Sequence, residues 1–152
     1  MGITTRPELD LPCGSSMGKV ANVALGIALA RPDRKVLAID GDGALLMNLG
    51  GLVPITEMSP KNLCYAVLQD DAYLTTGSQP VPGVGKVDFP IIAKGAGFPN
   101  CYSFDDMEEF SGAFRSVFQV PGPTFIALKV ENPGKTRYDF DLPPSPDASR
   151  FG

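Results

Sequence analysis

Three short apolar runs constrain the fold of this chain more than any other feature of its sequence. They are "KVLAID" at 35–40, "NLCYAVL" at 62–68 and "TFIALKV" at 124–130. Continuous apolar runs of this length are typical of strands that are buried on both faces of a parallel sheet. Because helical spacing separates the runs, the sequence predicts a three-layer α/β fold, in which helices cover both faces of a mostly parallel sheet.

Two helices are expected in the first third of the chain. Apolar residues recur every three or four positions across 17–31, and Pro32 interrupts the pattern. The same spacing resumes across 44–53, so a second helix should follow the glycine-rich turn after 35–40. Pro54 must bend or end that helix, because a proline in a helix interior costs about 3 kcal/mol.

The second half of the chain predicts a long loop and two more helices. Glycine, proline, serine and threonine are frequent across 69–86, which is long for a connection and is therefore a candidate functional loop. A short helix is expected within 88–97, with Asp88 as its N-cap and Gly97 near its C-cap. A longer helix is expected within 103–119, where acidic residues in the first turn suit the helix dipole.

Length and composition are those of an ordinary globular domain. The 152 residues fit one domain, 43% of them are apolar and 20% charged, and the net charge is -4. The chain is not basic enough for a nucleic-acid surface, so no nucleic-acid partner is expected. No signal peptide precedes the domain and no apolar run reaches the roughly 20 residues of a membrane span, so we expect a cytoplasmic protein without membrane association.

Cysteine and histidine usage narrows the chemistry. The cysteines, Cys13, Cys64 and Cys101, are odd in number and lack CxxC spacing, which argues against a disulfide framework and a zinc site. The chain contains no histidine, so Ser-His-Asp, Cys-His and histidine-ligated metal chemistry cannot be built from it alone. Catalytic groups must come from other side chains, from a cofactor or from another subunit.

Two polar clusters, "DGDG" at 40–43 and "QDDAY" at 69–73, begin where predicted strands end. Because ligands bind at the carboxyl ends of parallel strands, both clusters should face one crevice. Asp42 from the first cluster and Asp70 or Asp71 from the second could hold a divalent cation that carries a phosphate group. The alternative for either cluster alone is an ordinary capped turn, although two facing acidic ends repel each other and favour a bound cation.

Several motifs resemble those of thiamine diphosphate-dependent enzymes, in which GDG follows a buried strand and NN follows a later one. "GSSMGKVANVALGIAL", "IDGDGALLMNLGGL" and "DDAYLTTGSQP" look like landmarks of the 3-sulfopyruvate and phosphonopyruvate decarboxylases, in the same order. The ending "SRFG" is similar to the closing segment of that group. The resemblance implies the thiamine diphosphate-binding fold over 13–132, after a shortened N-terminal segment at 1–12 and before an extended proline-rich tail at 133–152.

The resemblance also implies a site for thiamine diphosphate and Mg²⁺. By position in the motifs, Asp42 binds magnesium directly and Asp70 stands at the metal-binding asparagine. The backbone carbonyl of Ala72 completes the protein's share of the coordination. The backbone amides of Gly43 and Ala44 approach the diphosphate.

The same resemblance assigns further contacts. "GSSMG" looks like the loop against the aminopyrimidine, where the Ser15 carbonyl accepts from the 4′-amino group and Met17 wedges the cofactor into a bent shape. The other predicted cofactor-binding residues are Ser16, Gly41, Tyr73 and Leu74. Candidates for contact with a small 2-oxo acid substrate are Thr75, Thr76 and Ser78.

Three positions depart from the family pattern. Asp70 replaces the usual asparagine and adds a negative charge, so the ion should bind well and the diphosphate less well. Asp71 replaces a residue that is commonly glycine, and Lys19 stands where phosphonopyruvate enzymes often have a histidine. The family's first strand looks shortened, so that edge of the sheet is expected to be missing or supplied by a neighbour.

The catalytic glutamate of the family is not expected in this chain. In the family it comes from a separate pyrimidine-binding domain, and nothing in this sequence resembles that domain. Glu57, Glu108 and Glu109 lie in helical stretches, where we expect solvated surface. The resemblance therefore implies the diphosphate-binding subunit of a split 2-oxo acid decarboxylase, active in a hetero-oligomer with a pyrimidine-domain subunit.

Two other functions fit parts of the sequence. In a phosphatase of the haloacid-dehalogenase type, Asp40 would be the nucleophile and Asp42 the acid/base. Asp70 and Asp71 would then be the metal pair, but "GSSMG" would go unexplained. In the thiamine family, Asp40 more simply ends the strand and supports the turn, and a non-catalytic subunit with the same fold is the third alternative.

Overall fold

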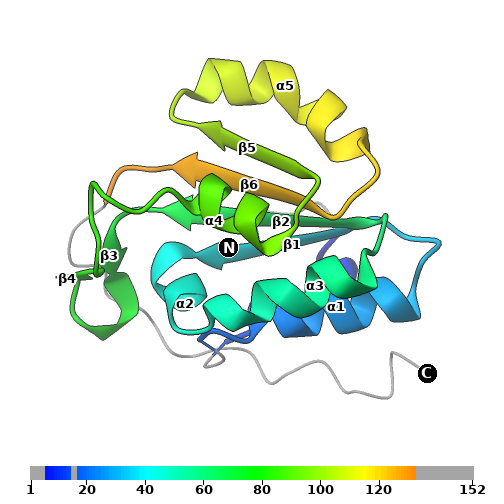
Figure 1. Cartoon of the computed structure of the whole chain (residues 1–152), viewed down its shortest axis with the longest axis horizontal. Helices are drawn as coiled ribbons and strands as arrows, with labels where there is room; N and C mark the ends of the chain where they lie inside the picture. The colour runs from blue at the N-terminus through cyan, green and yellow to red at the C-terminus, as the bar shows by residue number, and fades with distance from the viewer. Residues whose placement is uncertain (1–5, 15–16, 133–152) are drawn as a thin grey trace.

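The computed structural model describes residues 6–14 and 17–132. Its centre is a four-stranded parallel sheet in the order β1-β2-β6-β5 (Figure 1). The strands are β1 (Val36–Gly41), β2 (Leu63–Gln69), β5 (Asn100–Phe104) and β6 (Thr124–Lys129). The three strands predicted from the apolar runs are confirmed, and so is the α/β class with helices on both faces of the sheet.

Helices and a small hairpin complete the described part of the chain. The α-helices are α1 (Val20–Ala30), α2 (Asp42–Leu46), α3 (Leu52–Met58), α4 (Phe89–Ala96) and α5 (Met107–Gln119). The short elements are the 3-10 turns η1 (Pro7–Leu9), η2 (Leu49–Gly51) and η3 (Leu74–Thr76), and the antiparallel strands β3 (Ala72–Tyr73) and β4 (Gln79–Pro80). None of the described helices has the length and apolar character needed to traverse a bilayer.

The sheet separates two apolar cores. Helices α1, α3 and α4 pack over one face, and α5 packs over the other (Figure 1). Alternate residues of β2 belong to the two cores, with Tyr65 and Val67 in the first and Cys64 and Ala66 in the second. All of them are buried, which explains why the apolar run of β2 shows no polar alternation.

Strand β5 is not predicted by the sequence. It lies at an edge of the sheet with β6 as its neighbour, and within it only Phe104 is fully buried. The polar residues Asn100 and Ser103 therefore interrupt the apolar pattern. The strand also takes the first residues of the predicted helix 103–119, which begins only at Met107.

The region after β1 corrects a second expectation. Instead of one helix across 44–53, the chain forms α2, η2 and α3, with a break at Asn48. The Asn48 backbone leaves the helical region, with φ −150° and ψ 55°, and its side-chain amide donates to the carbonyl of Gly18 at 2.7 Å. Pro54 then lies in the first turn of α3, where its missing N–H removes no hydrogen bond, so it neither bends nor ends a helix.

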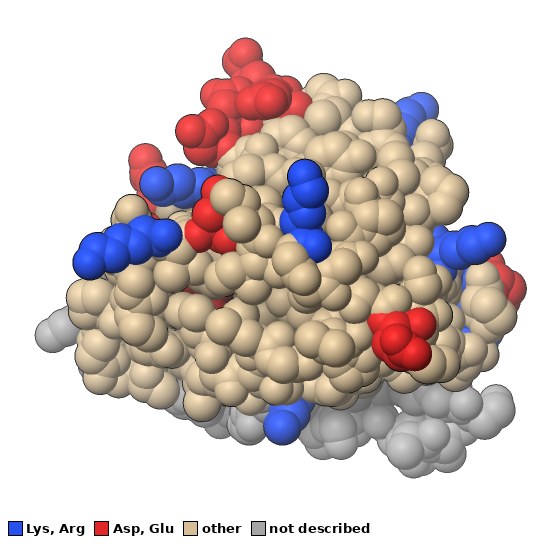
Figure 2. All heavy atoms as spheres, viewed as in Figure 1, with Lys and Arg blue, Asp and Glu red and all other residues tan. Residues whose placement is uncertain are grey.

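The expected caps of the later helices are present. Asp88 Oδ1 accepts a hydrogen bond from the Ile91 backbone N–H at 2.9 Å, and Gly97 ends α4 in the left-handed conformation, with φ 106°. Asp106 Oδ1 accepts from the Glu109 N–H at 2.8 Å and begins α5. Figure 2 shows acidic side chains gathered where α5 begins, and the positive end of the helix dipole favours them there.

Replacing Asp106 with alanine should lower the free energy of unfolding by about 1 kcal/mol, because the first turn of α5 loses its side-chain acceptor. Urea denaturation followed by circular dichroism measures the change. Asp105→Ala is the matched control, since it removes an exposed acidic neighbour that caps no helix, and its effect should stay below about 0.5 kcal/mol. Equal losses in both variants would contradict the role of Asp106 as the N-cap.

Candidate functional site

The two polar clusters lie side by side at the carboxyl edge of the sheet. Strand β1 ends at Gly41, and α2 begins directly at Asp42. The neighbouring strand β2 ends at Gln69 and leads into the β3–β4 hairpin. Since β1 and β2 are parallel, with Gly41 opposite Leu68, the expected convergence on one edge is confirmed.

The carboxylate of Asp42 joins the two clusters. Its side chain is only 1% exposed. Its Oδ1 accepts a hydrogen bond from the backbone N–H of Gly43 at 2.7 Å, and its Oδ2 accepts one from the backbone N–H of Asp71 at 2.8 Å. One buried carboxylate therefore fixes both the start of α2 and the end of β2.

Burial raises the pKa of Asp42 to about 6, although the Asp71 and Gly43 N–H groups oppose the shift. The negative charges of Asp70 and Asp71 raise this pKa further. A cation beside these groups would favour the charged form of Asp42 and offset the repulsion. The electrostatics of the cluster thus suit a bound divalent ion, as the sequence predicts.

The loop after β2 has a backbone that explains its composition. Asp71 is in the left-handed conformation, with φ 60°, which aspartate tolerates better than most residues and glycine best of all. Its Oδ1 accepts from the Gln69 side-chain amide at 3.0 Å. Asp70 Oδ1 accepts from the Ala72 N–H at 3.2 Å, so the loop holds both carboxylates by local hydrogen bonds.

Gly43 leaves room for an aromatic ring. A Cβ placed on Gly43 would lie 2.6 Å from Cδ1 of Tyr73, a separation that real Cβ contacts essentially never show. Tyr73 therefore packs directly against the first turn of α2. The sequence singles out both residues, but the ring contact that requires a glycine at position 43 is visible only in the folded chain.

The loop before α1 reaches the same region. Thr75 Oγ1 lies 3.9 Å from the sulfur of Met17, and this contact joins the loop to the β3–β4 hairpin. Gly18 has φ 74°, and its carbonyl accepts from the Asn48 side chain, which also donates to Asn22 Oδ1 at 3.0 Å. Asn48 is not among the predicted site residues, although a polar residue within the apolar segment 44–53 is a signal for such a role. The predicted contacts Ser15 and Ser16 lie outside the described residues.

Asp40 supports the turn from inside the sheet. Its Oδ2 accepts from the Tyr65 hydroxyl at 2.7 Å, and its Oδ1 accepts from the Gly41 N–H at 3.0 Å. Burial raises the pKa of Asp40, and burial beside this carboxylate also raises the pKa of the Tyr65 phenol. With both oxygens engaged and Tyr65 fully buried, Asp40 acts as a structural support, which is the role expected in the thiamine family.

The remaining candidates lie on the hairpin or away from the site. Thr75 and Thr76 are exposed in η3, and the backbone N–H of Ser78 donates to the Tyr73 carbonyl at 2.9 Å. All five glutamates of the sequence fall in the described part, and each is exposed. In that same part of the chain, no three His, Cys, Asp or Glu side chains converge as metal ligands.

Comparison with known proteins identifies the family. Residues 12–128 match the family described as "Thiamine pyrophosphate enzyme, C-terminal TPP binding domain". The chain belongs to this family. The match supports the TPP-binding domain independently of the motifs. It also favours a thiamine-dependent function over the phosphatase alternative.

Three relatives of this TPP-binding domain are decarboxylases or subunits of one. Sulfopyruvate decarboxylase of Methanosarcina acetivorans is 36% identical over 92% of this chain and 35% of its own length. The beta subunit of sulfopyruvate decarboxylase of Methanothermobacter thermautotrophicus is 38% identical over 76% of this chain and 59% of its own length. Phosphonopyruvate decarboxylase of Streptomyces viridochromogenes is 34% identical over 76% of this chain and 28% of its own length. The chain thus spans between about a quarter and three fifths of the length of these relatives.

A solved structure supports the fold of the TPP-binding domain. A chain assigned as a thiamin diphosphate-dependent enzyme of Mycobacterium smegmatis superposes with a TM-score of 0.62. The superposition covers 77% of this chain and 22% of the other, at 22% sequence identity. At this identity the likeness concerns the fold alone.

Gly43→Ala should lower the free energy of unfolding by about 1–3 kcal/mol, because the new methyl group would overlap the Tyr73 ring. Urea denaturation measures the loss. Gly41→Ala is the matched control, since nothing lies within 4 Å of its added Cβ. Similar losses in the two variants would contradict the close packing of Tyr73 against α2.

Asp42 should make the stability of the protein depend on pH. Its pKa of about 6 in the folded state exceeds the ordinary value of 3.8, so the native protein binds the proton more tightly than the unfolded chain between these values. The contribution of Asp42 to the free energy of unfolding should therefore fall as the pH rises through this window. Urea denaturation of the wild type and Asp42→Asn at several pH values, without divalent cations, measures the difference. Parallel pH profiles would contradict the raised pKa.

Proposed function

We propose that this chain is the diphosphate-binding subunit of a split thiamine diphosphate-dependent 2-oxo acid decarboxylase, of the sulfopyruvate or phosphonopyruvate type. The observation that carries the proposal is the buried Asp42 at the end of β1, tied to the Asp70–Asp71 loop at the end of β2. That pair of strand ends forms the predicted cofactor motif, and relatives named as decarboxylase beta subunits support a subunit role.

The residues present fit a metal-bound diphosphate. Asp42, Asp70 and the backbone carbonyl of Ala72 would hold Mg²⁺, and the amides of Gly43 and Ala44 at the start of α2 would approach the diphosphate. Oxygen ligands of this kind are those that magnesium prefers. The pKa of Asp42, about 6 without a cation, is the physical support for a cation here, because a positive charge would offset the crowding of carboxylates.

The cofactor would supply the chemistry of the reaction, and this chain would bind and orient the cofactor. When bound, thiamine diphosphate supplies the electron sink for the pair released with carbon dioxide. The part of this chain is to hold and orient the cofactor: Met17 would press against it from the loop that Asn48 anchors through Gly18. Ser15, Ser16, Gly41, Tyr73 and Leu74 would complete the contacts around it.

The glutamate that activates the cofactor has no candidate in this chain. Every glutamate is exposed, and none belongs to the two polar clusters at 40–43 and 69–73 or to the loop before α1. We therefore propose that a pyrimidine-domain subunit contributes it across a shared interface. Thr75, Thr76 and Ser78, on the hairpin beside the metal loop, would face the small 2-oxo acid substrate.

The split can be tested by reconstitution. The chain alone, with thiamine diphosphate and Mg²⁺, should release no carbon dioxide from sulfopyruvate or phosphonopyruvate, whereas the complex with the pyrimidine-domain subunit should release it from one of them. Robust turnover by the lone chain would overturn the split. A complex that binds neither cofactor nor ion in calorimetry would indicate the non-catalytic subunit instead.

Asp70→Asn should tighten the binding of thiamine diphosphate by the complex roughly fivefold, because it removes a negative charge beside the diphosphate. Isothermal titration calorimetry at a fixed Mg²⁺ concentration measures the change. Asp105→Asn removes the same charge from the loop after β5, on the same edge of the sheet, and should leave the affinity unchanged. Equal affinities in all three proteins would show that Asp70 does not face the diphosphate.

A further inference from the structure

Asn48 lies just after the end of α2, and its side chain reaches the loop before α1. The amide nitrogen donates to the carbonyl of Gly18 at 2.7 Å and to Asn22 Oδ1 at 3.0 Å. The backbone N–H of Asn48 donates to the Leu45 carbonyl at 3.0 Å, which closes the last turn of α2. One residue therefore joins the end of α2 to the segment that carries Met17.

This junction is closely packed. A Cβ placed on Gly18 would lie 3.2 Å from Cβ of Asn48 and 3.3 Å from Cβ of Met47. Gly51 leaves similarly little room, since its own Cβ would lie 3.2 Å from the Asn48 amide nitrogen. Packing around the Asn48 amide thus supports its hydrogen bond to Gly18.

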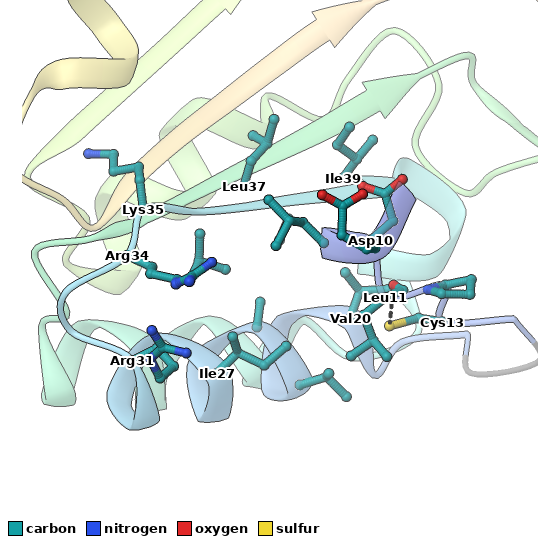
Figure 3. A pocket seen from close by; sticks show the side chains of 17 residues that line it. Asp10, Leu11, Cys13, Val20, Ile27, Arg31, Arg34, Lys35, Leu37 and Ile39 are labelled. Atoms are coloured by element: carbon teal, nitrogen blue, oxygen red, sulfur yellow. Dashed lines mark hydrogen bonds between the residues drawn. The ribbon is translucent and has the colours of Figure 1, made fainter. Parts of the chain in front are cut away.

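Helix α1 holds the other end of the segment. Ala21, Ala24 and Ala28 are buried in the core on this face of the sheet. Val20 and Ile27 line the space between α1 and β1 (Figure 3). Since packing sets the position of α1, the short segment before it runs between a fixed helix and Asn48.

A second side chain also contacts this segment within the described ranges. The hydroxyl of Thr75 lies 3.9 Å from the sulfur of Met17. A thioether is a weak acceptor, whereas the Gly18 carbonyl is a strong one. The stronger restraint on the segment therefore comes from Asn48.

Helix α2 connects this restraint to the carboxylate cluster. It begins at Asp42, whose side chain accepts from the backbone N–H groups of Gly43 and Asp71. The six residue steps from Asp42 to Asn48 correspond to about 9 Å at the rise of a helix. Because hydrogen bonds hold both ends of α2, the separation between Asp42 and Gly18 is fixed in the folded chain.

We propose that Asn48 is a positioning residue that makes this chain select thiamine diphosphate over a bare diphosphate. This role rests on the proposed function, in which Asp42 holds the magnesium-bound diphosphate and Met17 meets the ring system of the cofactor. With Asn48 in place, the two contacts are held at one separation before the cofactor arrives. Preorganisation of this kind raises affinity, because the loop does not have to be ordered on binding.

Only a ligand that reaches both contacts benefits from the fixed separation. Inorganic diphosphate with Mg²⁺ occupies the Asp42 end and does not reach Met17, whereas thiamine diphosphate extends to both. Loss of the Asn48 amide should therefore affect the two ligands differently. A purely structural role, in which Asn48 stabilises the fold as a whole, would not separate them.

The first test uses the full-length chain without cofactor or partner. Asn48→Ala removes the amide but keeps the Cβ that lies against Gly18. The Gly18 carbonyl and the Lys19 N–H share one peptide plane, so ¹⁵N relaxation at Lys19 reports the motion of that carbonyl. Its order parameter should be about 0.85 in the wild type and fall toward about 0.6 in the variant. An unchanged order parameter would overturn the proposal.

Asn100→Ala is the matched control. The side-chain amide of Asn100 donates to the Pro121 carbonyl at 2.9 Å, which is the same kind of bond at the amino end of β5, opposite the cofactor edge. This variant should lose a comparable part of its stability in urea while Lys19 stays ordered. Circular dichroism confirms the fold of each variant.

Calorimetry with the reconstituted complex measures the selection. In the presence of Mg²⁺, Asn48→Ala should bind thiamine diphosphate about tenfold more weakly than the wild type, and inorganic diphosphate within about twofold of it. Asn100→Ala should match the wild type for both ligands. Wild-type affinity of Asn48→Ala for thiamine diphosphate, or an equal loss for both ligands, would overturn the positioning role and leave the proposed function intact.

A double-mutant cycle tests whether Asn48 acts through Met17. Met17→Ala removes the side chain that meets the ring system, so adding Asn48→Ala should cause no further loss of thiamine diphosphate affinity. Additive losses would overturn the positioning role alone. A wild-type complex that binds neither ligand would instead overturn the proposed function and this role with it.

Discussion

The rest of the site depends on the buried carboxylate of Asp42. Its two oxygens accept backbone hydrogen bonds from the start of α2 and from the loop after β2, so it fastens together two segments that leave different strands. Parallel pairing of β1 and β2 brings those strand ends together, and the carboxylate fixes their loops. The same group that organises the loops is also the proposed metal ligand, which makes the site largely formed before any ion binds.

This arrangement has an electrostatic cost. Burial and two neighbouring aspartates raise the pKa of Asp42 to about 6, so the folded chain holds a carboxylate that takes up a proton more readily than an ordinary aspartate. A cation would relieve that tension, and the domain is thereby adapted to a ligand. Asp40 shows the other outcome for a buried acid, because the Tyr65 hydroxyl and the Gly41 amide satisfy it within the protein.

The carboxyl edge of the sheet and the outer edge of β1 are each incomplete in a different way. The carboxyl edge has loops, amides and carboxylates for a cofactor, but no buried glutamate to activate one. The β1 side has apolar surface and unpaired backbone, but no strand among the described residues. We propose that a partner subunit supplies that glutamate.

The sequence by itself determined the class of fold, three strands, the caps of α4 and the two acidic clusters, because burial on both faces and capping leave local patterns. It could not predict β5, whose single neighbour leaves it half-buried, nor the break at Asn48, which a hydrogen bond to Gly18 stabilises from 30 residues away. Tertiary structure alone decided that Asp40 and Asp42, two residues apart, have different partners. Strand alternation turns Asp40 toward Tyr65 inside the core, whereas Asp42, as the first residue of a helix, meets the end of another strand.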